Sequence, residues 1–173
     1  MFFYTGDGNP DSRRVWWVGD VDKRQRLEWW PGLDAWLGEE TEGPLLHAVG
    51  DIAVSGHPVE ITLRTTAPYD GHPALTLTCD GKHLWATGPD GTRLDETVLT
   101  EPAARLRILT VGEYVEVYAD DVFALTTLCY SGHPAPWTAV TEDRTHTIPV
   151  RPLRLPDPDR DDASAVWPGP PRS

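Results

Sequence analysis

The stretch from Ala104 to Tyr130 constrains the fold more than any other part of this sequence. It divides into three apolar runs separated by two short polar pairs. The runs are Arg105 to Val111, Tyr114 to Ala119 and Val122 to Tyr130, and the pairs are Gly112-Glu113 and Asp120-Asp121. In the first two runs residues alternate between two faces, as in strands with one buried side. The pattern predicts an antiparallel meander with a tight turn at each pair.

Shorter runs of the same kind come earlier in the chain. They span His47 to Val54, Val59 to Arg64, Leu75 to Cys79 and His83 to Thr87. Asp80-Gly81 predicts a type I′ hairpin, and Asp90-Gly91 predicts the next reversal of the chain. Short strands at this spacing, without helical periodicity, indicate an all-β fold, a two-sheet antiparallel β-sandwich of the concanavalin-like jelly-roll kind.

The end of the chain is rich in proline. A loop is predicted from Ser131 to Arg144, followed by one more strand from His146 to Leu155. Pro149 and Pro152 place this strand at a sheet edge, because proline lacks the N–H that a central strand donates. The sandwich is therefore expected over residues 45–155, and the Pro- and Asp-rich residues 156–173 are expected to form a disordered tail.

Composition limits what the chain can bind. Its 173 residues include 27 acidic and 15 basic side chains, for a net charge of -12. This charge opposes binding to nucleic acid and to anionic membranes, so neither is an expected partner. The sequence has no signal-peptide pattern and no run of about 20 apolar residues. A cytoplasmic protein is expected.

Cysteine and histidine residues give no metal pattern. Cys79 and Cys129 both fall on apolar runs, which favours buried free thiols over a disulfide. The six histidines lack HxH or HxxxH spacing, so no metal site is expected. Phosphate-cradling glycine loops and Gly-x-Ser-x-Gly elbows are absent as well, and no cofactor is expected.

The meander resembles the closing strands of the C-terminal β-sandwich of glycoside hydrolase family 32, which includes invertases, levanases and inulinases. The matching residues are Val115-Glu116-Val117-Tyr118, Asp120-Asp121 and Ala124-Leu125-Thr126. The sequence departs from the family at Val111-Gly112-Glu113, where Asp and Arg or Ser are usual. The resemblance implies a sandwich that accompanies a five-bladed catalytic propeller.

The N-terminal segment has two interpretations. Arg13 to Gly19 is apolar on both faces, which is typical of an interior strand. Together with Phe3-Tyr4 it resembles the last strand of the family's propeller, and the alternative is an edge strand of the sandwich. Under the first interpretation residues 1–44 are a propeller-derived strand and a linker, with a turn at Trp29-Trp30-Pro31-Gly32.

The family's catalytic carboxylates lie in Asn-Asp-Pro, Arg-Asp-Pro and Glu-Cys motifs, none of which occurs in this sequence. A glycosidase without its nucleophile and acid cannot form or resolve its intermediate. No catalytic residue is therefore assigned, and the chain is expected to be inactive by itself.

The candidates for sugar binding or a domain interface are Trp85, Tyr114, Glu116, Tyr118 and Trp137. Aromatic rings stack on sugars, but buried or interface aromatics give the same sequence pattern. Glu116 is either an acceptor for sugar hydroxyls at a propeller interface or a strand residue that pairs with Arg105 or Arg107 across the sheet.

Two functions follow from these observations. The first is the non-catalytic β-sandwich of a family 32-like enzyme acting on the fructosyl bonds of sucrose or fructan. The second is a free-standing carbohydrate-binding or protein-interaction module. The expected partner is accordingly a catalytic propeller domain or a carbohydrate ligand.

Overall fold

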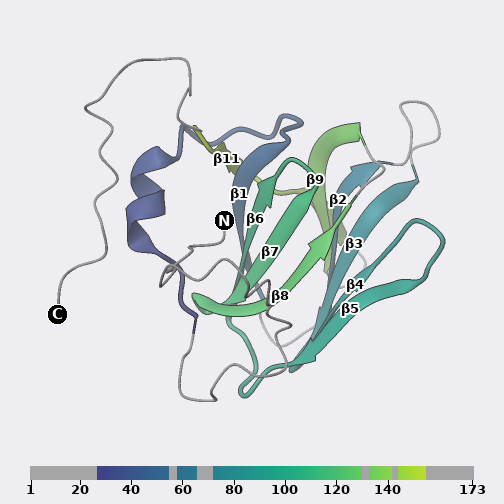
Figure 1. Cartoon of the computed structure of the whole chain (residues 1–173). Helices are drawn as coiled ribbons and strands as arrows, with labels where there is room; N and C mark the ends of the chain where they lie inside the picture. Colours follow the sequence, from purple (N-terminus) through teal and green to yellow (C-terminus); the bar gives the residue numbers. More distant parts are fainter. Residues whose placement is uncertain (1–26, 55–57, 66–71, 130–132, 142–143, 155–173) are drawn as a thin grey trace, which may run out of the picture.

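The computed structural model describes residues 27–54, 58–65, 72–129, 133–141 and 144–154, which form an all-β sandwich (Figure 1). Its helical element is the 3-10 helix η1, Pro31–Trp36. The strands are β1 His47–Ala53, β2 Val59–Thr65, β3 Pro73–Asp80, β4 His83–Thr87, β5 Arg93–Val98, β6 Arg105–Val111, β7 Tyr114–Ala119, β8 Val122–Leu128, β9 His133–Thr141, β10 Arg144–Thr147 and β11 Val150–Pro152.

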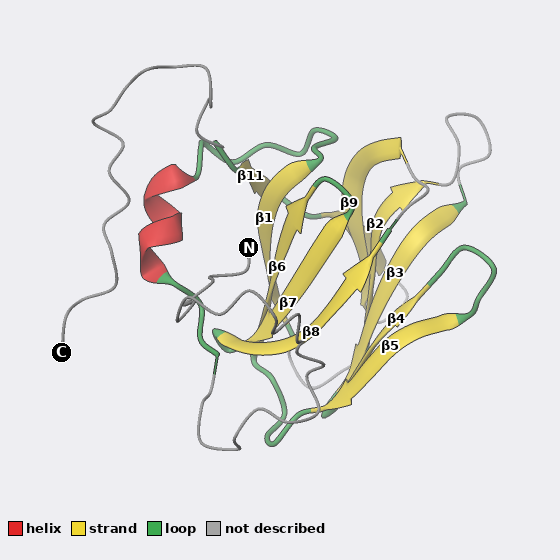
Figure 2. Ribbon diagram, in the orientation of Figure 1, coloured by secondary structure: helices red, strands yellow, loops and turns green. Residues whose placement is uncertain are grey.

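Two antiparallel sheets pack face to face (Figure 2). One has five strands in the order β11-β1-β6-β7-β8, and the other has six in the order β10-β9-β2-β3-β4-β5. The side chains between them are buried at alternate positions of the central strands, for example Ile61, Leu77, Ile108 and Val117. The predicted sandwich is confirmed, because the period-two patterns place one apolar face of each sheet against the other.

The meander of β6, β7 and β8 is confirmed with its turns. Asp120 and Asp121 have φ values of 49° and 65°, and a type I′ turn needs positive φ at both of its central residues. The β3–β4 hairpin differs from the prediction. Its central residues are Gly81 and Lys82, and of the two only Gly81 has a positive φ, at 61°. This turn is therefore not type I′, because Lys82 avoids the left-handed region that its Cβ disfavours.

The loop predicted from Ser131 to Arg144 is wrong, because most of it is strand β9. This strand lies between β2 and β10 in the six-stranded sheet. Pro134 and Pro136 obscured its alternation, although Trp137 and Ala139 are buried at alternate positions. The prolines lie beside a register shift in β2 between Thr62 and Arg64, where the ladder is interrupted.

The strand predicted from His146 to Leu155 is divided in two. β10 ends at Thr147 in the six-stranded sheet, and β11 begins at Val150 in the five-stranded sheet. Pro149 lies between them, where the chain crosses from one sheet to the other. Both pieces are edge strands, as the prolines predicted.

Residues 27–41 lie on the outer face of the five-stranded sheet and are not a detached linker. Isolated bridges join Glu28 to Val122, Leu37 to Leu153 and Thr41 to Val150. A second apolar cluster lies under this segment and contains Trp29, Val49, Leu109 and Leu153. The domain boundaries otherwise stay a prediction, because the strand proposed at residues 13–19 and the tail after residue 155 lie outside the described residues.

Candidate functional site

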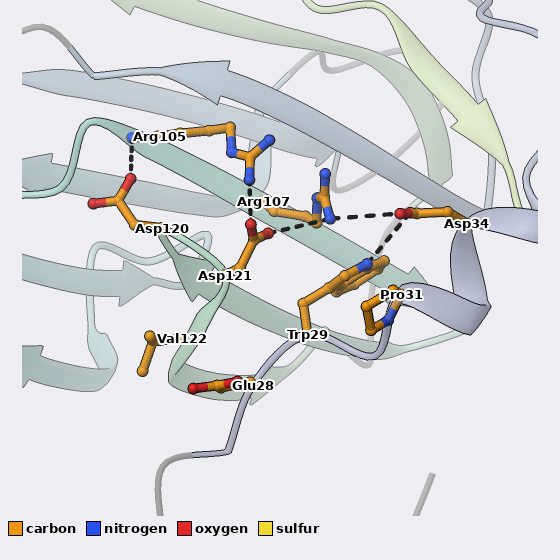
Figure 3. A pocket seen from close by; sticks show the side chains of 9 residues that line it. All are labelled: Glu28, Trp29, Pro31, Asp34, Arg105, Arg107, Asp120, Asp121 and Val122. Atoms are coloured by element: carbon orange, nitrogen blue, oxygen red, sulfur yellow. Dashed lines mark hydrogen bonds and ion pairs between the residues drawn. The ribbon is translucent and has the colours of Figure 1, made fainter. Parts of the chain in front are cut away.

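A cluster of three arginines and three aspartates lies on the outer face of the five-stranded sheet, and part of it is drawn in Figure 3. We call it the arginine–aspartate cluster. Its members are Asp34 of η1, Asp51 of β1, Arg105 and Arg107 of β6, Asp121 of the β7–β8 turn and Arg151 of β11. Its formal charges cancel, so the cluster can be covered by other residues without leaving a net charge.

Arg107 is the centre of the cluster. Its Nε donates to Asp51 Oδ1 at 2.8 Å, and its Nη1 lies 3.2 Å from Asp121 Oδ1 and 3.9 Å from Asp34 Oδ1. The side chain is 10% exposed. Burial by itself would lower the pKa of Arg107, but the hydrogen bond to Asp51 and the charges of the three aspartates raise it above its ordinary value. Arg107 is therefore a fixed cation that ties three separate elements together.

Trp29 covers this arginine. The guanidinium carbon of Arg107 lies 4.7 Å from the centre of the Trp29 ring, in a cation–π contact. The indole Nε1 donates to Asp34 Oδ1 at 3.3 Å, and Tyr118 packs against the indole edge to face with 5.2 Å between ring centres. Trp29 is only 6% exposed, so its ring is not available to stack on a ligand.

The β7–β8 turn carries two carboxylates with different partners. The carboxylate of Asp120 accepts from the backbone N–H of Ala104 at 3.1 Å and of Arg105 at 3.0 Å. Asp121 Oδ2 accepts from Arg105 Nη2 at 2.5 Å. Asp121 Oδ1 is buried and has a charge partner in Arg107 but no hydrogen bond within the described residues. Asp120 and Asp121, whose φ values are positive, are therefore held in place by donors of Ala104 and Arg105 at the start of β6.

An open hollow of about 510 Å³ adjoins the cluster (Figure 3). Its lining consists of Glu28, Trp29, Pro31, Asp34, Arg105, Arg107, Asp120, Asp121 and Val122. Asp34 and Asp121 lie beside arginines, and Asp120 is bound to backbone N–H groups. The three aspartates of the lining therefore already have protein partners.

Three of the candidates predicted from sequence come together on the outer face of β7. Tyr118 Oη donates to Glu116 Oε2 at 2.7 Å, and Glu116 lies opposite Thr126 of β8. Burial, followed by the hydrogen bond and charge of Glu116, raises the pKa of Tyr118 well above its ordinary value. Burial also raises the pKa of Tyr114, against a hydrogen bond with Thr126 that lowers it. We call Tyr114, Glu116 and Tyr118 the β7 triplet.

The predicted pairing of Glu116 with Arg105 or Arg107 is wrong. Glu116 lies opposite Leu109 on β6. The two arginines instead pair with aspartates from β1 and from the β7–β8 turn. The arginines pair with aspartates because both lie toward the Asp120-Asp121 end of the β6–β7 pair: Arg107 is opposite Tyr118, two positions from Glu116, and Arg105 is further away.

The two candidate tryptophans lie in different environments. Trp137 is 1% exposed in the core, and a Cβ at Gly50 would lie 2.7 Å from its ring. Trp137 therefore cannot stack on a sugar, and this candidate is wrong. Trp85 is half-buried on the outer face of the six-stranded sheet, with the guanidinium of Arg93 4.9 Å from its ring centre.

Other predicted features concern metals, thiols and membranes. Cys79 and Cys129 are buried and form no disulfide, and burial raises the pKa of the Cys79 thiol. Within the described ranges, groups of three or more His, Cys, Asp or Glu residues that could hold a metal ion are not found. In the same ranges, the structure has no helix of the length and apolarity needed to cross a membrane.

Comparison with known proteins adds no relatives: neither a protein-family model nor a curated protein matches the chain. The resemblance to family 32 therefore rests on sequence alone, on the residues of the meander and of the N-terminal segment. The arginine–aspartate cluster was not predicted from the sequence, although both arginines of β6 and the Asp120-Asp121 pair were noted there.

Proposed function

We propose that the chain is the non-catalytic β-sandwich of a family 32-like enzyme that acts on fructosyl bonds, and that it binds the catalytic domain without hydrolysing sugar itself. The observation that carries this proposal is the arrangement of the family-like residues on the β7–β8 hairpin. Val115 and Val117 are buried in the core, whereas Glu116 and Tyr118 lie on the outer face. The resemblance therefore includes outward-facing side chains, of which Tyr118 packs on Trp29 and Glu116 accepts its hydrogen bond.

The contact surface that we propose is the edge of the five-stranded sheet at β7 and β8. Tyr114 lies opposite Leu128, and Glu116 lies opposite Thr126. Leu128 is 40% exposed, and Tyr114 and Glu116 are partly exposed. An exposed leucine beside an aromatic and a carboxylate gives the mixed apolar and polar character of a contact between domains.

The direct test of origin is the coding sequence upstream of Met1. In-frame Asn-Asp-Pro, Arg-Asp-Pro and Glu-Cys motifs there would support the proposal. An upstream reading frame that encodes an unrelated domain would overturn it.

A biochemical test uses the full chain and a separately expressed family 32 propeller without its own sandwich. We expect no release of fructose from sucrose, levan or inulin by the chain alone, and co-elution of the two proteins in size-exclusion chromatography. Leu128→Asp should abolish co-elution, and Val140→Asp on the other sheet, whose parent side chain is 37% exposed, is the matched control. Fructose release by the chain alone that disappears in Glu116→Gln would contradict the proposal.

A further inference from the structure

The outer face of the six-stranded sheet carries five threonines in one row. The row crosses β10, β9, β2, β3 and β4 and consists of Thr147, Thr138, Thr62, Thr76 and Thr87. Each lies directly opposite the next in the strand register, so all five share one face. We call this set the threonine row.

The spacing of the row follows from sheet geometry. Neighbouring strands lie about 4.8 Å apart, so the five strands place a hydroxyl and a methyl group at five positions over about 19 Å. All five side chains are partly exposed. Within the part of the chain that the structure describes, none of the five hydroxyls makes a hydrogen bond. Their donors and acceptors are free for a ligand.

A second row runs beside the first. It consists of Thr145, Val140, Glu60, Thr78, Trp85 and Glu96. Trp85 gives this row a half-exposed aromatic ring. Figure 1 shows η1 on the five-stranded side of the molecule, and none of the described elements covers the six-stranded sheet from outside.

We propose that the threonine row binds an extended chain of a neutral polysaccharide, which lies across the strands and contacts Trp85. A threonine hydroxyl both donates and accepts, as a sugar hydroxyl does, and the threonine methyl groups can pack on the apolar C–H faces of sugar rings. Glu60 and Glu96 flank the row, Arg93 lies opposite Thr87 at its end, and the chain carries a net charge of -12. The net charge repels anionic polymers, and the hydroxyl groups of the row, which carry no charge, match those of a neutral chain.

This inference does not depend on the β7–β8 contact of the proposed function. Threonine is also common on exposed strands because it has high β-propensity and forms stabilising cross-strand pairs. A purely structural role predicts an effect on stability and none on binding. The two roles are separated by replacing hydroxyls with methyl groups, since valine keeps the shape and the strand preference of threonine.

The test measures retardation of the full chain in native gels that contain levan, inulin, mixed-linkage β-glucan or arabinoxylan, with polygalacturonate as the anionic polymer. We expect retardation by at least one neutral polysaccharide and none by polygalacturonate. Thr62→Val/Thr76→Val/Thr138→Val should weaken it at least about tenfold, the scale of a few weak hydrogen bonds lost together. Trp85→Ala should weaken it as well.

The control is Thr100→Val, which removes one exposed hydroxyl that lies outside both rows and should leave retardation unchanged. Loss of retardation in this control, or unchanged retardation in the triple valine variant with its fold intact by circular dichroism, would overturn the inference. So would the absence of retardation by all four neutral polysaccharides. If the propeller fails to co-elute with the chain, the proposed function fails and the threonine-row inference is unaffected.

Discussion

The two outer faces of this sandwich are built in opposite ways. The outer face of the five-stranded sheet is charged and covered, with Arg107 beneath Trp29 and beside three aspartates. The outer face of the six-stranded sheet is largely uncharged along the threonine row, and no described element lies over it. The first face uses its polar groups to hold residues 27–41 in place, whereas the second leaves the hydroxyl groups of the threonine row without a partner among the described residues.

The energetics of burial explain this difference. An arginine that is removed from water is tolerated only when carboxylates and hydrogen bonds replace the water. The arginine–aspartate cluster supplies both, which offsets the cost of desolvating Arg107 beneath the segment. Threonine hydroxyls that remain half-exposed can bind water and need no protein partner. A covered face therefore needs internal pairing, and an open face can keep its groups for a ligand.

The largest effect is expected from the tryptophan on the covered face. Trp29→Ala should lower the free energy of unfolding by about 3 to 5 kcal/mol, because it removes a buried aromatic and the ring beneath which Arg107 lies. Trp85→Ala on the open face should cost no more than about 1 kcal/mol. Urea denaturation followed by far-ultraviolet circular dichroism measures both. Equal losses in the two variants would show that the two faces do not differ in burial.

The next effect comes from the arginines. Arg107→Met should cost about 2 to 3 kcal/mol, less than a fully buried pair because its partners are partly exposed. Arg93→Met is the matched change on the open face, where Arg93 and Glu96 are 53% and 63% exposed, and should cost under about 1 kcal/mol. If Arg107→Met is as stable as the parent, the cluster does not hold residues 27–41 in place.

The sequence predicted the parts of the fold that depend on neighbouring residues. Strand alternation and the Asp120-Asp121 turn are local, so β6, β7 and β8 were predicted nearly to the residue. The turn at Gly81 was misplaced by one residue. Strand β9 was missed because prolines such as Pro134 and Pro136 are usual in loops. They lie beside the β2 register shift, which depends on how the strands pair and cannot be read from the local sequence.

The two outer faces could not be predicted, because they depend on strand register. Arg107 meets Asp51 across 56 positions of sequence, and no local pattern links them. Each threonine of the row could be assigned to an outward position by alternation, but its alignment with four others requires the pairing of five strands. Of the predicted site, Tyr114, Glu116 and Tyr118 share one face because they alternate along a single strand.

Stability at alkaline pH is a further test of the covered face, where Tyr118 lies. The pKa of Tyr118 is raised in the folded state, so the folded protein keeps a proton that the unfolded chain releases above about pH 10. Its contribution to stability is complete below that pH and is lost as pH rises through the folded pKa. Tyr118→Phe should be less stable at neutral pH by about 1 kcal/mol, for the lost hydrogen bond, and should lose less stability between pH 10 and 11. A parallel decline in both proteins would show that the β7 triplet is not the source.

The smallest effect on stability is expected on the open face. Thr62→Val/Thr76→Val/Thr138→Val should change the free energy of unfolding by under about 1 kcal/mol, because valine matches threonine in shape and in strand preference. The matched buried change is Thr110→Val on the inner face of the five-stranded sheet, since Thr110 is buried and its Oγ1 accepts from the backbone N–H of Ala48 at 3.2 Å. This single change leaves that N–H without its side-chain acceptor and should cost about 1 to 3 kcal/mol. One buried hydroxyl would then contribute more to folding than three on the open face. A triple valine variant that loses more stability than Thr110→Val would mean that the threonine row serves the sheet itself, and the open face would not differ from the buried interior in what its hydroxyls contribute.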